Sequence, residues 1–118
     1  MSGDQRLHLA NITFDAADPP ALARFWAAVT GRTVAMSEAH FAMLTSESDG
    51  IRWLFIKVPE GKTAKNRCHL DFHTANREAE VERLVALGAT RGATRNEWNV
   101  EWTTLQDPEG NEFCVAAE

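Results

Sequence analysis

The most regular alternation of apolar and polar residues lies in the segment 67–73. Its apolar positions are Cys68, Leu70 and Phe72. Its polar positions are His69, Asp71 and His73. Because successive side chains of a strand point to opposite sides, the pattern predicts a strand with one apolar face and one polar face. Three ionisable side chains on one face indicate either a solvated sheet surface or the floor of a binding site.

Similar patterns predict the elements of the first half of the chain. A strand is expected over residues 7–15, and its polar face carries Asn11, Thr13 and Asp15. A helix follows, because Asp18 suits an N-cap, two prolines suit the first turn and Gly31 suits the end. Apolar residues recur in it at helical spacing, at Leu22, Phe25, Trp26 and Val29. Further strands are predicted over 33–36, 40–45 and 51–58.

The second half repeats this order. A strand over 67–74 leads to a helix that Asn76 caps and Gly88 ends. Further strands are predicted over 98–105 and 111–116. The segment between the helix and the first of these, 90–96, is ambiguous and has room for one short strand.

The two halves align at a constant offset. Asn11 and His69 are 58 residues apart, as are Phe14 and Phe72. A repeat of this length indicates an internal duplication. We therefore predict one α+β domain over residues 1–118, built from two βαβββ modules at about 7–58 and 66–117 with a linker at 59–65. The helices lie outside a cupped, mostly antiparallel sheet, whose polar faces surround a shared groove.

Composition narrows the classes of partner. The net charge of −5 argues against a nucleic-acid surface, and no apolar run is long enough for a membrane span. The N-terminal residues do not resemble a signal peptide. The two cysteines, Cys68 and Cys114, are too few for a disulfide framework and are expected to be buried free thiols. We expect a cytoplasmic protein.

Three further segments carry a family resemblance. They are Asp18-Pro19 with the following Ala23-Arg24-Phe25-Trp26, the run from Lys65 to Asp71, and the run from Asp107 to Cys114. With the tandem order, they resemble the glyoxalase-like branch of the vicinal oxygen chelate superfamily. That superfamily includes glyoxalase I, extradiol dioxygenases, thiol transferases and bleomycin-resistance binders. Its members often form homodimers, so the resemblance implies a homodimer here.

The resemblance also implies where a metal site would lie. The ligand positions of metal-dependent members correspond to Asn11, His69 and Cys114, and to either Ile56 or Leu54. Of these, His69 is a usual ligand and Cys114 a less usual one, so the set is incomplete. We therefore expect a protein that binds a small organic molecule without a complete metal site. The alternative is a divalent-metal-dependent lyase, isomerase or dioxygenase; glyoxalase I activity itself is not expected.

Two groups of residues are candidates for the site. His69 and Asp71 lie two positions apart on one strand face. They are either a general base and the carboxylate that holds it, or a hydrogen-bonded pair that closes a polar groove. Trp98 and Trp102 form either an aromatic wall of the groove or part of the core. The remaining candidate ligand-binding residues are Asn11, Thr13, Asp15 and His73.

Overall fold

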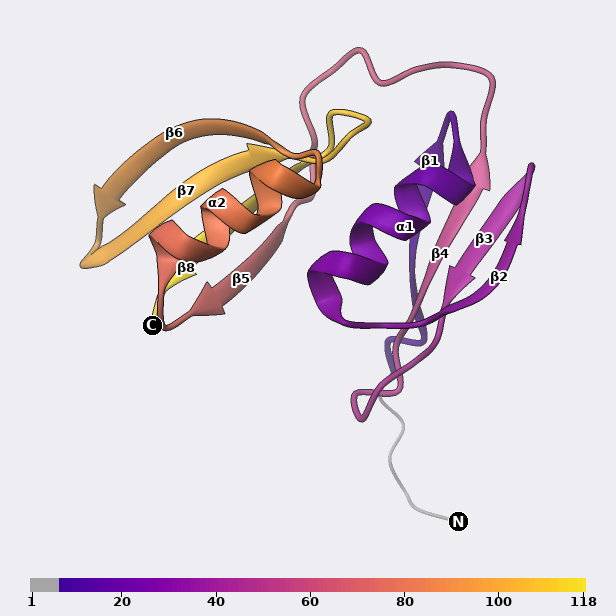
Figure 1. Ribbon diagram of the computed structural model, residues 1–118, viewed down its shortest axis with the longest axis horizontal. Coiled ribbons are helices and arrows are strands. Elements are labelled where there is room, and N and C mark those ends of the chain that lie inside the picture. The colour runs from indigo at the N-terminus through magenta and orange to yellow at the C-terminus, as the bar shows by residue number, and fades with distance from the viewer. Residues whose placement is uncertain (1–6) are drawn as a thin grey trace.

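The computed structural model describes residues 7–118, which fold into two βαβββ modules in tandem (Figure 1). The elements of module one are β1 (Asn11–Ala16), α1 (Pro19–Thr30), β2 (Val34–Glu38), β3 (Phe41–Leu44) and β4 (Arg52–Lys57). Those of module two are β5 (Leu70–Thr74), α2 (Arg77–Leu87), β6 (Thr90–Glu97), β7 (Val100–Gln106) and β8 (Glu112–Ala117). The predicted α+β class and the tandem repeat are confirmed.

Each module contains one four-stranded mixed sheet. The strand orders are β1-β4-β3-β2 and β5-β8-β7-β6, so the first and last strands of each module are neighbours. These neighbours run parallel, whereas the other pairs in each sheet are antiparallel. One helix packs on one face of each sheet (Figure 1). The opposite faces, here called the first and second open faces, are therefore not covered by a helix of the same module.

Both helices begin and end where the sequence predicts. The Asp18 side chain accepts a hydrogen bond from the Ala21 amide, and Asn76 does the same for the Ala79 amide. Helix α1 ends at Gly31, whose φ of 76° is the left-handed conformation that glycine adopts without steric cost. Gly88 ends α2.

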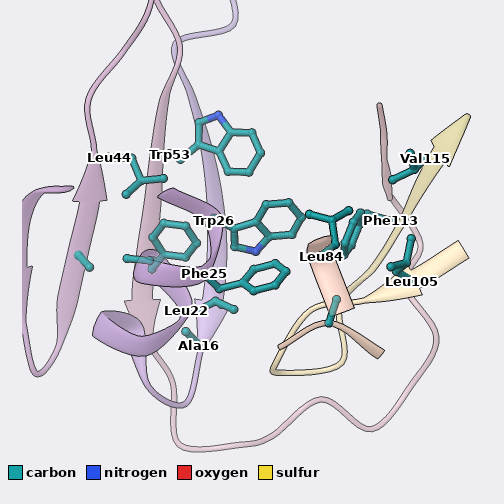
Figure 2. Packing of buried hydrophobic residues seen from close by; sticks show 14 of the residues in the cluster. Ala16, Leu22, Phe25, Trp26, Leu44, Trp53, Leu84, Leu105, Phe113 and Val115 are labelled. Atoms are coloured by element: carbon teal, nitrogen blue, oxygen red, sulfur yellow. The ribbon is translucent and has the colours of Figure 1, made fainter. Parts of the chain in front are cut away.

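Trp26 of α1 lies at the centre of a core that the two modules share (Figure 2). Its ring centroid lies 5.3 Å from that of Trp53 in β4 and 4.9 Å from that of Phe113 in β8. Its indole nitrogen donates a 2.9 Å hydrogen bond to the buried carboxylate of Asp107. A single side chain of module one is thus packed and hydrogen-bonded against module two.

Module two also holds both ends of α1. The Glu109 carboxylate accepts hydrogen bonds of 2.6 and 2.8 Å from the amides of Ala17 and Asp18 at the N-terminal end. At the other end, the Arg83 guanidinium donates bonds of 3.2 and 3.3 Å to the carbonyls of Ala28 and Val29. An anion at the N-terminus and a cation at the C-terminus both complement the helix dipole. These contacts fix the orientation of one module against the other.

Three details differ from the sequence predictions. The segment 90–97, expected to hold at most a short strand, is the eight-residue strand β6. Trp98 belongs to the turn after it rather than to β7. Cys68 is exposed rather than buried, because β5 begins only at Leu70 and Cys68 lies in the bend before it. Cys114 is buried as predicted, and both thiols are free. Within residues 7–118, neither helix is long and apolar enough to cross a membrane.

Candidate functional site

The second open face has a floor of small side chains. In one row across the sheet, the paired residues are His73, Ala116, Trp102 and Arg95. In the next row they are Asp71, Cys114 and Thr104. Residues paired across strands point to the same face. Ala116, Cys114 and Thr104 are short, so the larger side chains beside them enclose a hollow.

Trp98 and Trp102 form one wall of this hollow. Their rings are nearly parallel, at an interplanar angle of 4° and a centroid distance of 6.1 Å. Trp98 and Asn99 connect β6 to β7 with φ angles of 52° and 62°, the signature of a type I′ turn. The Trp98 side chain is 85% exposed. The sequence left two interpretations of this pair, an aromatic wall of the groove or part of the core. The exposure of Trp98 favours the wall.

His69, Asp71 and Cys114 meet at the other side of the hollow. Each offers one donor atom, and the three atoms lie within 4.8 Å of one another. His69 Nε2 lies 3.4 Å from Asp71 Oδ1, an ion pair when the imidazole is protonated. The Cys114 thiol lies 3.5 Å from the Thr104 hydroxyl, and burial together with the neighbouring Asp71 carboxylate raises its pKa. The thiol is therefore protonated, and poorly nucleophilic, at neutral pH.

The hollow between these two sides, here called the tryptophan hollow, has a volume of about 530 Å³. This volume falls in the usual range for small-molecule sites. The predicted site residues that line it are His69, Asp71, His73, Trp98, Trp102 and Cys114. The structure adds two cations that sequence reasoning missed, Lys65 and Arg95. Recognising 90–97 as a strand would have placed Arg95 on this face.

The three site residues predicted in module one lie elsewhere. Thr13 and Asp15 line a separate cavity of about 410 Å³ between the modules, under residues 60–66. His69 contributes to both cavities. Asn11 lines neither of them. The described residues therefore bring the second-module candidates together and leave the first-module candidates outside the tryptophan hollow.

The donor set and the aromatic wall permit two kinds of chemistry. Parallel indole rings provide an apolar surface on which a planar molecule stacks. An imidazole, a carboxylate and a thiol are ligands that zinc and iron accept. Donor atoms of a tetrahedral zinc site lie about 3.3–3.8 Å apart, given bonds of 2.0–2.3 Å. A contraction of about 1 Å at the widest pair would thus bring the three donors to metal-binding distances.

Comparison with known proteins gives a family and a fold. A family model described as a glyoxalase-like domain matches residues 11–116. The chain is similar in structure to a glyoxalase/bleomycin resistance protein/dioxygenase family enzyme from Burkholderia phytofirmans, with a TM-score of 0.75, 20% identity and coverage of 94% of this chain and 98% of that one. A possible glyoxalase from Bacillus cereus gives a TM-score of 0.72 at 19% identity, covering 93% and 98%. At these identities the likeness shows the fold alone. No match was found among curated proteins.

Proposed function

The chain belongs to the glyoxalase-like domain family, and from this premise we propose that it binds a planar organic molecule in the tryptophan hollow. The observation that carries the proposal is the stacked pair of Trp98 and Trp102 beside a floor of small side chains. A ligand that stacks on the pair buries one of its apolar faces against the indole rings. Its edge lies next to the polar side chains Asp71 and His73 of β5.

The backbone at Trp98 supports the proposal. A bulky residue with φ near 52° is rare, and the left-handed conformation costs about 1–2 kcal/mol for a residue with a side chain. Turns of this type usually contain asparagine or glycine at these positions. Residues held in such conformations cluster at active sites and ligand clamps. The sequence places an exposed tryptophan where a glycine would fit better, which is expected of a ligand-binding ring.

Replacing Trp102 tests the proposal. Isothermal titration calorimetry with two-ring planar probes, 2-naphthoate, 2-naphthamide and quinoline, measures affinity for the wild type and for Trp102→Ala. Loss of the stacked ring should weaken the tightest probe about tenfold, or about 1.4 kcal/mol. Phe41→Ala is the matched control, because Phe41 holds the corresponding position in module one. Equal affinities in all three proteins would refute the proposal.

A second candidate function rests on the group of His69, Asp71 and Cys114. With a divalent ion on these three donors, the protein would be a metal-dependent lyase, isomerase or dioxygenase. The donors fit such an ion, which when bound would supply a Lewis acid that polarises a ligand oxygen. The raised pKa of Cys114 makes thiolate binding less favourable at neutral pH and more favourable as the pH rises. Without a metal, the proposed general base is His69, which Asp71 would orient.

Elemental analysis separates the two candidates. Protein purified without chelator is compared with His69→Ala and with His73→Ala, a histidine on the same face that lies outside the donor group. One equivalent of zinc, iron, nickel or manganese in the wild type and in His73→Ala, but not in His69→Ala, would establish the metal site. Equal, sub-stoichiometric metal in all three would remove this candidate.

A further inference from the structure

The charges that line the tryptophan hollow are mostly paired with one another. Lys65 lies 3.2 Å from the Glu112 carboxylate, and His69 lies beside Asp71. Arg95, an exposed residue of β6, differs, because its guanidinium forms no ion pair or hydrogen bond with any residue of 7–118 and lies over no aromatic ring there. Other arginines of β6 and α2, such as Arg91 and Arg83, are paired with carboxylates. The hollow thus contains one solvent-exposed cation without a partner among the described residues.

The position of Arg95 relates it to the aromatic wall. Arg95 on β6 is paired with Trp102 on β7, so both side chains rise from the same face with Cβ atoms about 5 Å apart. The guanidinium presents a planar fork of N–H donors that matches a carboxylate. A ring stacked on Trp98 and Trp102 would have its edge next to this fork.

The rest of the hollow determines how much negative charge the ligand can carry. Asp71 lies on β5, three strands away from β6, at a distance of roughly 14 Å between strand axes. Its carboxylate disfavours an anion at that end, and Lys65 is already paired with Glu112, so Arg95 is left as the cation available to a ligand anion. A monoanion matches the single unpaired guanidinium. A dianion such as a phosphate monoester would leave charge uncompensated.

We propose that the tryptophan hollow selects a planar aromatic carboxylate, whose ring stacks on Trp98 and Trp102 and whose carboxylate is bound by Arg95. This inference rests on the proposed function and names the ligand class for the same site. With the carboxylate held at β6, the far end of the ligand points across the small floor towards His69, Asp71 and Cys114. Arg95 is thus the residue that sets the orientation of the ligand.

Calorimetry with a matched acid and amide tests the inference. The probes are 2-naphthoate and 2-naphthamide, which share the ring system and differ in charge. The variants are Arg95→Gln and, as control, Arg52→Gln, which removes an exposed arginine from β4 of module one. The wild type and Arg52→Gln should bind the acid about tenfold more tightly than the amide at low ionic strength. This preference should diminish with added salt and disappear in Arg95→Gln, while the affinity for the amide is unchanged.

The possible outcomes distinguish the two proposals. If the amide binds and the acid binds no more tightly, or if Arg95→Gln retains the preference, the inference about the carboxylate is wrong and the proposed stacking site remains. If neither compound binds the wild type, the inference fails together with the stacking site. Amide binding by Arg95→Gln also shows that the variant is folded.

Discussion

The two modules have the same order of elements and the same strand order, but their open faces carry different side chains. The row His73, Ala116, Trp102 and Arg95 of module two corresponds to Asp15, Ile56, Phe41 and Glu38 of module one. The next row, Asp71, Cys114 and Thr104, corresponds to Thr13, Leu54 and Met43. The register thus identifies Leu54, rather than Ile56, as the counterpart of Cys114.

The difference lies in side-chain size and in chemistry. At the three floor positions, module two has alanine, cysteine and threonine, whereas module one has isoleucine, leucine and methionine. The corresponding side chains of module one are thus longer at all three positions. Module one also lacks an imidazole at the positions of His69 and His73, where it has Asn11 and Asp15. One backbone arrangement therefore presents larger apolar side chains on the open face of one copy and a hollow on that of the other.

The largest expected effect is a loss of stability when Trp26, at the centre of the core that the two modules share, is replaced. Trp26→Ala removes the ring between β4 and β8 and leaves the buried Asp107 carboxylate without its indole donor. We expect the free energy of unfolding to fall by about 3–5 kcal/mol, as for other large aromatic residues in cores. Urea denaturation followed by circular dichroism measures it. A loss below about 1 kcal/mol would show that the modules do not depend on a common core.

The next prediction replaces one floor residue of the second open face by its counterpart from the first open face. Ala116→Ile puts into module two the residue that module one has at the same position. The added side chain projects into the tryptophan hollow, so affinity for 2-naphthoate should fall about tenfold or more while stability changes by less than about 1 kcal/mol. The reciprocal variant, Ile56→Ala, should bind as the wild type does. Unchanged affinity in Ala116→Ile would show that the ligand binds elsewhere.

The turn that presents Trp98 has no tryptophan counterpart in module one, where residues 39 and 40 are alanine and histidine. Trp98→Gly relieves the left-handed backbone but loses the stacking on Trp102 and adds flexibility to the unfolded chain. These contributions offset one another, so we expect stability within about 1 kcal/mol of the wild type and affinity reduced about fivefold. Asn99→Gly changes the same turn without removing a ring and should keep full affinity. Calorimetry with 2-naphthoate checks both variants.

The smallest expected effect is a dependence of the stability on pH that comes from Cys114, a residue of module two. Burial raises the pKa of Cys114 above its usual value of 9.0, so above that pH the unfolded chain releases a proton that the folded chain retains. The contribution of Cys114 is therefore fully present below this pH and is lost as the pH rises further. Between about pH 8 and about pH 10, the stability of Cys114→Ala should fall less than that of the wild type. Cys68→Ala, which removes the exposed thiol, is the matched control. Equal slopes for the wild type and Cys114→Ala would contradict the assignment to Cys114.

Local patterns in the sequence predict most of the fold. The alternation at 69–73 and 11–15 identifies the polar strand faces, and the caps Asp18 and Asn76 identify both helix starts. The sequence is ambiguous over strand β6, with room for a short strand, because every one of its residues is exposed and burial imposes no alternation of apolar and polar types. The position of Arg95 was therefore missed.

Two features of the candidate site could not be predicted from local patterns, because they depend on strand pairing over a long sequence distance or on a strained backbone. Asp71 joins Cys114 only because β5 and β8 pair in parallel, which places residues 43 positions apart side by side. No local pattern specifies that register. Trp98 was placed in a strand because it alternates with Val100 and Trp102, whereas its positive φ places it in the turn, against the intrinsic preference of a tryptophan.

The most direct test of the account maps where a planar acid binds. In a ¹H–¹⁵N NMR titration of the wild type with 2-naphthoate, the account predicts that shifts concentrate on residues 71–73, 95–104 and 114–116 and on the Trp98 and Trp102 indole N–H groups. The equivalent strands of module one, 11–15, 41–43 and 54–56, should show none. Shifts centred on module one, or on the cavity between the modules around Asp15 and Glu60, would contradict the claim that the second open face alone is the binding site.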